Sequence, residues 1–163
     1  MKAYNIIVIT SMLTSMLASC ERIPAFSKQT VTDWRVESTE AVLQTIAMES
    51  ANQPARGQAL VALTIINRAR IRHTTPEIEA LRPFQYSAWN RGGKWAKAWL
   101  WSYWGYKARK QAILAYSSGL AMASKPKFQG IRHYHTKAVH PGWARGQTPC
   151  LVIGDHKFYK DIL

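Results

Sequence analysis

Hydrophobic residues between positions 38 and 71 recur with the period of an α-helix. In STEAVLQTIAMES they fall three and four residues apart, on one helical face: Val42, Leu43, Ile46 and Ala47. Ser38 or Thr39 can cap the start of this helix, and the polar turn before Pro54 can end it. The next stretch, PARGQALVALTIINRAR, is apolar over a broad face, which predicts a second, central helix. We therefore expect a helical hairpin.

The second half of the sequence predicts one more helix and a short strand. ARKQAILAYSSGLAMA has helical spacing and ends at SKPK. IRHYHT alternates as a strand does, with His133 and His135 on one face and Tyr134 on the other. The intervening segment 94–110 combines tryptophans, tyrosines and cations without a clean amphipathic pattern. Core packing with a share in a cleft wall is our first interpretation of it; a membrane-interface anchor and a glycan platform stay open.

The N-terminus has the pattern of a bacterial secretion signal. Lys2 precedes an apolar run that is too short to span a bilayer, and Leu17-Ala18-Ser19-Cys20 follows. These four residues resemble a lipobox, which implies cleavage before Cys20 and lipidation of its sulfur. We expect a signal peptide at residues 1–19, a lipidated tether at 20–37 and one domain at 38–163. By the same resemblance, Glu21 favours the inner face of the outer membrane in a Gram-negative cell.

The charge of the chain is strongly positive. Its 163 residues include 22 Lys and Arg against 9 Asp and Glu, for a formal charge of +13. A secreted protein this basic is expected to bind an anionic surface, although charge alone does not choose among wall polymers, lipids and nucleic acid. Because Cys150 is the single cysteine left after Cys20, we expect no intramolecular disulfide and a buried, inert thiol.

Glu49 is a lone carboxylate on the apolar face of the first predicted helix. It follows Val42 by seven residues and Ile46 by three, so helical phase turns it inward, and it falls in the last turn. Partial burial and the negative end of the helix both disfavour a charged carboxylate there. A carboxyl that keeps its proton beside a cleft can act as the general acid of glycoside cleavage. The open alternative is a carboxylate that faces solvent or pairs with Arg56.

Four blocks of the sequence together resemble the SleB-type cell wall hydrolases. They are MESANQPARGQALVALTIINRAR, FQYSAWN, HYHT with HPGW, and VIGDHKFY, and they cover roughly residues 39–160. The resemblance implies an α+β, lysozyme-like fold, mostly helical with a small antiparallel sheet. It also implies cleavage of the bond between N-acetylmuramic acid and N-acetylglucosamine, with Glu49 as the catalytic residue. Gln53 stands where the family carries a second glutamate, which puts a role for that second carboxylate in doubt.

The scarcity of acids favours a lytic transglycosylase over a two-carboxylate glycosidase. Asp155 is the single other acid within a family block, so a partner carboxylate is hard to supply. In a lytic transglycosylase the muramyl 6-hydroxyl attacks its own anomeric carbon, and one glutamate serves as acid and then as base.

Substrate contacts are implied by the resemblance and by the side chains in its blocks. Aromatic faces and amide or hydroxyl groups suit N-acetylated sugars. The residues that we expect to bind the substrate are Gln58, Gln85, Tyr86, Ser87, Tyr134 and Trp143, with Pro141 beside Tyr134 and Trp143 in one wall of the cleft. The resemblance also puts Gly154, His156 and Phe158 in a closing strand.

Two other functions stay open at this stage. One is a wall-binding lipoprotein without turnover, which the substitution at Gln53 favours. The other is a zinc amidase built on His133 and His135, although no HExxH motif or cysteine pair accompanies these histidines. We expect no metal and no cofactor, peptidoglycan rather than nucleic acid as the partner, contact with a membrane through the lipid on Cys20, and a monomer.

Overall fold

The computed structural model of the chain describes residues 28–89 and 103–162. The chain divides into two units, Met1–Arg35 and Val36–Leu163. The architecture below is that of the second unit, to which the first described helix contributes its residues from Val36 onward. The predicted signal peptide, the lipidation site at Cys20 and most of the tryptophan-rich segment lie outside the described residues. No described helix is long and apolar enough to cross a membrane.

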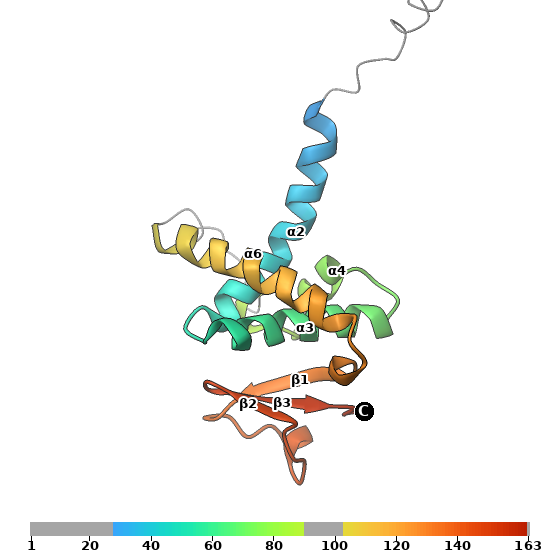
Figure 1. Ribbon diagram of the computed structural model, residues 1–163, viewed down its shortest axis with the longest axis vertical. Coiled ribbons are helices and arrows are strands. Elements are labelled where there is room, and N and C mark those ends of the chain that lie inside the picture. The colour runs from blue at the N-terminus through green and yellow to red at the C-terminus, as the bar shows by residue number, and fades with distance from the viewer. Residues whose placement is uncertain (1–27, 90–102, 163) are drawn as a thin grey trace, which may run out of the picture. The chain divides into compact units, whose positions relative to one another are not determined.

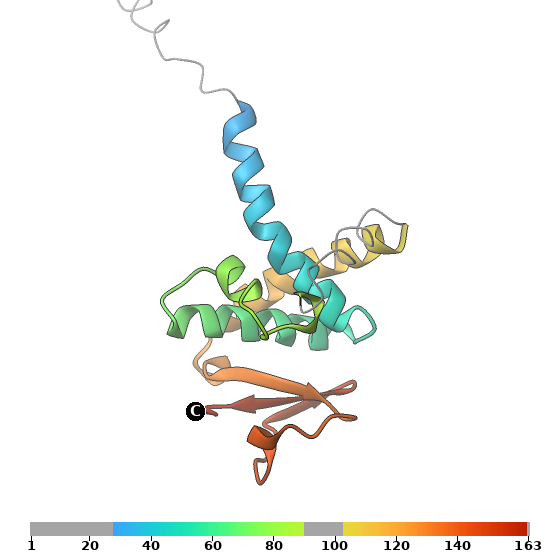
Figure 2. The same cartoon turned by 180° about the vertical axis from the view of Figure 1, so that it is seen from behind.

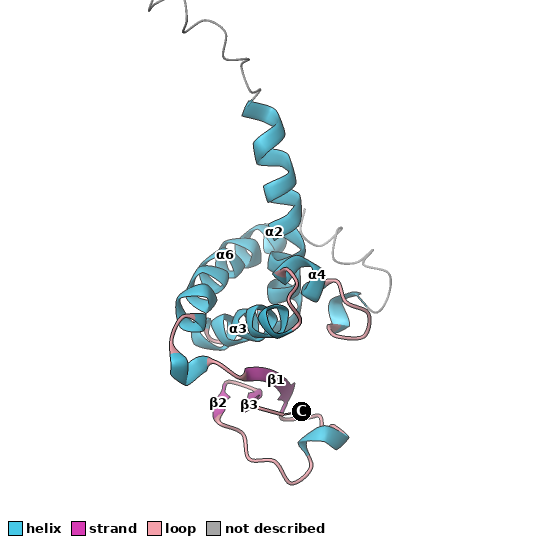
Figure 3. Cartoon of the chain, turned by 90° about the vertical axis from the view of Figure 1, so that its right-hand side faces the viewer, coloured by secondary structure: helices cyan, strands magenta, loops and turns pink. Residues whose placement is uncertain are grey.

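Helices and a small antiparallel sheet make up this unit, as Figures 1 and 3 show. The α-helices are α2 (Lys28–Ser50), α3 (Ala55–Ile71), α4 (Pro76–Ala80) and α6 (Tyr103–Ala123). Single 3-10 turns are η2 (Ser87–Trp89), η3 (Pro126–Phe128) and η4 (Gly142–Ala144). The strands β1 (Ile131–Thr136), β2 (Leu151–Ile153) and β3 (His156–Lys160) pair antiparallel in the order β1-β3-β2. The mostly helical α+β class is confirmed.

Helix α2 begins earlier than the sequence pattern predicts. It starts at Lys28, so the proposed cap at Ser38 or Thr39 is wrong, and residues 28–37 of the expected tether are helical. Because KQTVTDWRVE contains neither proline nor glycine, nothing in it stops a helix. Glu40 consequently lies within the helix, where Arg109 of α6 donates to its carboxylate at 2.9 Å.

Helix α3 is the centre of the unit. Every residue from Gly57 to Asn67 is buried, because α6 packs on one side of the helix and β1 lies on the other (Figures 1 and 2). The predicted central helix is therefore confirmed. Gly119 of α6 makes the crossing with α3 close: a methyl group there would lie 2.9 Å from Cβ of Ala62 and 3.2 Å from the carbonyl oxygen of Ala59.

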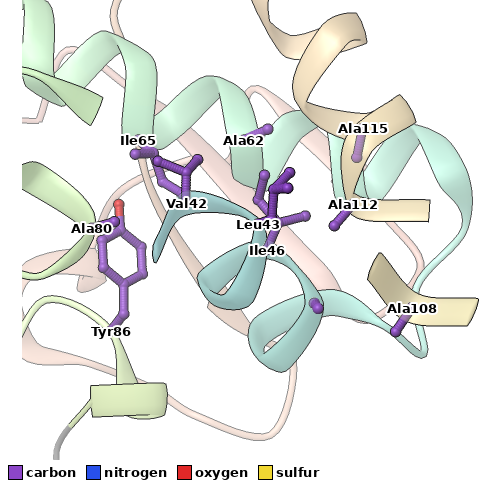
Figure 4. Close-up of a cluster of buried hydrophobic side chains, with 11 residues drawn as sticks. Val42, Leu43, Ile46, Ala62, Ile65, Ala80, Tyr86, Ala108, Ala112 and Ala115 are labelled. Carbon is purple, nitrogen blue, oxygen red and sulfur yellow. The ribbon is translucent and has the colours of Figure 1, made fainter. Parts of the chain in front are cut away.

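The inward stripe of α2 forms one core with α3, α6 and the loop that follows α4. Val42, Leu43, Ile46 and Ala47 are all buried, as the periodicity predicts. Figure 4 shows the labelled members of this stripe facing side chains of α3 and α6, with the ring of Tyr86 at one side of the cluster. This packing fixes the rotation of α2, and with it the direction in which Glu49 points.

The two faces of β1 have different neighbours. Tyr134 is paired with Phe158 and lies 5.0 Å, ring to ring, from His156. On the other face, the rings of His133 and His135 pack against Trp143, and His135 stacks on Tyr159. The predicted alternation of His133, Tyr134 and His135 is confirmed.

Candidate active site

Glu49 lies in the last turn of α2, and its carboxylate accepts three hydrogen bonds. Oε1 accepts from the Ser87 hydroxyl at 2.8 Å and from the backbone N–H of Ala88 at 3.1 Å, and Oε2 accepts from the Tyr134 hydroxyl at 3.2 Å. Within the part of the chain that the structure describes, Glu49 forms no ion pair. The inward orientation is confirmed, and the alternative pairing with Arg56 is wrong.

The segment Ser87–Trp89 is fixed against the inward face of α2. Indole Nε1 of Trp89 donates to Thr45 Oγ1 at 2.9 Å, and Thr45 precedes Glu49 by one helical turn. Residues four apart lie on the same side of a helix, so the two contacts hold η2 along α2. The donors to Glu49 are therefore positioned by the fold, as an electrostatically preorganised site requires.

Tyr134 reaches Glu49 from the sheet. Its ring packs against Phe158 and His156 on the face of β1 that points to the helices. Burial, followed by the negative charge of Glu49, raises the pKa of the Tyr134 hydroxyl well above its usual value. The hydroxyl therefore stays protonated and can donate to Glu49 throughout the neutral range.

Arg68, near the end of α3, binds the other end of the same loop. Its Nη1 donates to Gln85 Oε1 at 3.3 Å and to the Tyr86 hydroxyl at 3.4 Å. Tyr86 is 2% exposed and packs in the core, where burial raises the pKa of its hydroxyl. Direct contact between Tyr86 and a sugar, as predicted, does not fit this burial, because the ring fills the space beside Val42 and Ala80 (Figure 4).

Gln58 and Gln53 hold the turn between α2 and α3. Gln58 is largely buried, and its side chain donates to the backbone oxygen of Gln53 at 2.9 Å; its contact with substrate stays a prediction. Gln53 in turn accepts from the backbone N–H of Asp155 in the turn between β2 and β3. Gly154 has φ +56 and packs so closely on Gln53 that a Cβ there would overlap its side chain.

Trp143 lies away from Glu49, which corrects one prediction. Its ring packs against His133, His135 and Tyr159, on the face of β1 opposite to Tyr134. The prediction that Tyr134 and Trp143 line one wall of a cleft is therefore wrong: the chain after β1 folds back over the histidine face of the strand.

The structure gives the environments of His156, whose role the sequence left open, and of Cys150, whose exposure the sequence did not predict. His156 is buried beside Tyr134; burial lowers its pKa, and Glu49 and Asp155 partly oppose that shift. Cys150 is exposed, so its predicted burial is wrong, although local desolvation still raises the pKa of the thiol. The described residues contain no group of three or more His, Cys, Asp or Glu side chains that could hold a metal ion.

One group at the site and one exposed residue of the preceding loop were not identified from the sequence. The Ala88 N–H is a backbone donor, so no side-chain pattern in the sequence indicates it. Phe84 is 90% exposed and has φ 63, a left-handed conformation that costs a bulky residue energy. Its position after Pro83, at the start of FQYSAWN, is a signal that could have identified it.

A cavity of about 430 Å³ lies between the α2–α3 turn and α6, and Glu49 does not line it. Its lining is uncharged and includes Asn52, Gln58 and Gln111. This cavity is thus separate from the hydrogen-bonded group around Glu49.

Comparison with known protein families gives a match over most of the chain. The model of the cell wall hydrolase family matches residues 52–159, which is well over half of the chain. Comparison with curated proteins gives no match, and comparison with solved structures gives none either. Glu49 lies just before the matched stretch, while Ser87, Ala88 and Tyr134, which bind it, lie inside.

Proposed function

The chain belongs to the cell wall hydrolase family, and on that premise we propose that it cuts the glycan strands of peptidoglycan with Glu49 as its catalytic acid and base. The observation that carries the proposal is the set of three donors around one inward carboxylate: Ser87, Ala88 and Tyr134. Such a carboxylate, fixed by donors from a loop and from a strand, is equipped to exchange a proton with a bound substrate.

In this proposal the two carboxylate oxygens have different roles. A backbone N–H can only donate, so the Ala88 contact keeps Oε1 an acceptor. We infer that a protonated Glu49 carries its proton on Oε2, which faces the Tyr134 hydroxyl, because Oε1 already accepts from two donors and Oε2 from one. Oε2 gives that proton to the glycosidic oxygen as the bond to the muramyl anomeric carbon breaks. Tyr134 then donates to the Oε2 that has lost its proton.

The second half of the reaction returns a proton to Glu49. The carboxylate removes the proton of the muramyl 6-hydroxyl, and the oxygen of that hydroxyl forms the new bond to the anomeric carbon, which gives the 1,6-anhydro product. This lytic transglycosylase route needs no second carboxylate. In support, the other described acids with ion pairs are engaged elsewhere: Glu40 with Arg109, Glu79 with Arg72 and Asp161 with Arg132. Asp155 lies against Gln53.

Mass spectrometry of digested peptidoglycan tests this function. We expect the parent to release anhydro-muropeptides and Glu49→Gln to release none, while Glu77→Gln, a matched change on α4, behaves as the parent does. Reducing muramyl ends would indicate a muramidase, and freed stem peptides an amidase. Intact sacculi after treatment with a folded parent protein would indicate a binding protein and overturn the assignment of Glu49.

For the location, we propose a lipid anchor at Cys20. The support is the sequence pattern Leu17-Ala18-Ser19-Cys20 after an apolar run. Mass spectrometry of the N-terminal peptide of the protein from a bacterial host tests this anchor. We expect a diacylated Cys20 as the first residue, and Cys20→Ala to be released from the membrane fraction. An unmodified N-terminal peptide that retains residues before Cys20 would contradict the anchor.

A further inference from the structure

Three arginines gather beside the loop that holds Glu49. Asn67 of α3 donates to the backbone oxygen of Ile131 at 2.9 Å, which brings the next residues, Arg68 and Arg132, to the same end of β1. Arg72 follows Arg68 by one turn of α3. We call Arg68, Arg72 and Arg132 the arginine cluster. Arg68 connects the cluster to the loop between α4 and η2, because it binds Gln85 and Tyr86 of that loop.

The positive charge of this cluster is only partly neutralised. Arg72 pairs with the buried Glu79, but the described hydrogen bonds of Arg68 go to neutral oxygens at 3.3 and 3.4 Å. Arg132 has its nearest carboxylate, that of the exposed Asp161, at 3.8 Å, and Asp161 also lies 3.9 Å from Lys160. The cluster therefore retains unbalanced cationic charge.

Three buried polar atoms at the cluster or beside it have no hydrogen-bond partner within the described chain. They are Nε of Arg132, Nδ1 of the adjacent His133, and Oε2 of Glu79, which lies 3.6 Å from Nε of Arg82. A buried donor without a partner is destabilising, so the guanidinium of Arg132 favours an additional acceptor group. Burial, followed by the charges of Arg68, Arg132 and Arg72, lowers the pKa of His133 to about 4. The imidazole therefore adds no charge at neutral pH. The guanidinium groups of Arg68 and of the partly exposed Arg132 are the groups here that fit an anionic oxygen ligand.

Glu49 and the cluster are bound to the same two short segments. In the loop, Arg68 binds residues 85 and 86 while Glu49 binds residues 87 and 88. In β1, Arg132 and His133 directly precede Tyr134, which donates to Glu49. An extended chain advances about 3.3 Å per residue, so the two sites are a few residue lengths apart.

We propose that the arginine cluster binds carboxylates of the peptide stem of peptidoglycan, and so selects strands that carry stems. This inference rests on the proposed function. The stem is attached to the muramyl residue whose glycosidic bond is cut, so its carboxylates lie near the catalytic acid when the substrate is bound. Guanidinium groups bind carboxylates through paired, charge-assisted hydrogen bonds, for which arginine is better suited than lysine.

Purified glycan strands with stems, and the same strands after an amidase has removed the stems, test the proposal on the full chain. We expect the parent to favour stem-bearing strands, and the ratio of the two kcat/KM values to fall about tenfold in Arg132→Gln. Arg132→Lys keeps the positive charge but loses the planar pair of N–H donors, so its ratio should lie between those of the parent and Arg132→Gln. Arg70→Gln is the matched control, because Arg70 binds the Ala123 carbonyl at the end of α6 and should leave the ratio unchanged.

A binding measurement separates this proposal from the proposed function. A free tetrapeptide stem should bind the parent about ten times more tightly than it binds Arg132→Gln, whether or not either protein cuts glycan. If the parent binds the stem in this way but cleaves no strand, the function fails and the subsite stands. Three results would each overturn the subsite. The first is an equal loss of kcat/KM on both strand types in Arg132→Gln. The second is an equal affinity of the parent and the folded variant for the stem, and the third is competition with strand binding by inorganic phosphate but not by the stem.

Discussion

Asp155 donates its backbone N–H to Oε1 of Gln53 at 2.9 Å, and Nε2 of Gln53 lies 3.4 Å from the carboxylate of Asp155. One amide side chain thus joins the α2–α3 turn to the β2–β3 turn. A glutamate at position 53 could accept from the N–H but would face the Asp155 carboxylate without a donor. The substitution that raised doubt about activity therefore has a local structural reason, independent of catalysis.

Gln53→Glu should destabilise the protein by about 1–3 kcal/mol, because it places a buried carboxylate beside Asp155. Asp155→Asn in the same chain should restore most of this loss, since the asparagine amide can donate to the carboxylate introduced at position 53. Urea unfolding of the two single variants and the double variant measures the coupling. Additive effects of the two changes would show that the side chains do not interact.

Ser87→Ala and Tyr134→Phe should each lower kcat for glycan cleavage by about tenfold to a hundredfold, because each removes one donor to Glu49. The Ala88 N–H remains in both variants, so some activity should persist. Tyr106→Phe, on the exposed side of α6, is the matched control for the second change. Unchanged kcat in either folded variant would remove that donor from the mechanism.

The sequence could predict the inward direction of the Glu49 side chain but not the full set of groups around it. The direction of Glu49 depends on helical phase within α2, which is a local property. Its donors come from positions 38 to 85 residues away, and one of them is a backbone group. The position of Trp143 could not be predicted, because strand alternation gives the faces of β1 but not the face that a following loop covers. The start of α2 could not be predicted either. A serine or threonine that can cap a helix does not interrupt one when the residues before it are also able to form a helix.

Gly119→Ala should destabilise the fold by about 1–3 kcal/mol, because the added methyl would lie 2.9 Å from Cβ of Ala62 and 3.1 Å from the backbone nitrogen of Leu63. Helix propensity alone would favour alanine, so the sign of the change reports the closeness of α3 and α6. Gly142→Ala is the control, since nothing lies within 4 Å of its added methyl. Thermal unfolding compares the two; equal Tm values would mean that the helices separate readily.

Phe84→Gly should leave Tm equal to or above that of the parent, although it removes a large aromatic side chain. Phe84 is 90% exposed with φ 63, so glycine loses little packing and relieves strain of about 1–2 kcal/mol. If the exposed ring contacts the substrate, KM for peptidoglycan should rise at the same time. Ile78→Gly offers no such relief, and as an exposed control in α4 it should lower Tm. A clear fall in Tm for Phe84→Gly would show that the ring is packed.

Acidification should destabilise the protein partly through His133. Burial and the nearby arginines lower its pKa to about 4, against 6.5 as the ordinary value. Between these pH values the unfolded chain binds more protons than the folded one, so stability is fully present above pH 6.5 and is lost as pH falls towards 4. Because the imidazole is partly exposed, the loss attributable to it is on the order of 1 kcal/mol after screening. Urea unfolding at about pH 7.5 and about pH 5 should therefore give a smaller difference for His133→Gln than for the parent. His140→Gln, an exposed histidine change, should retain the parental difference, and the same difference in all three proteins would exclude His133 as a source.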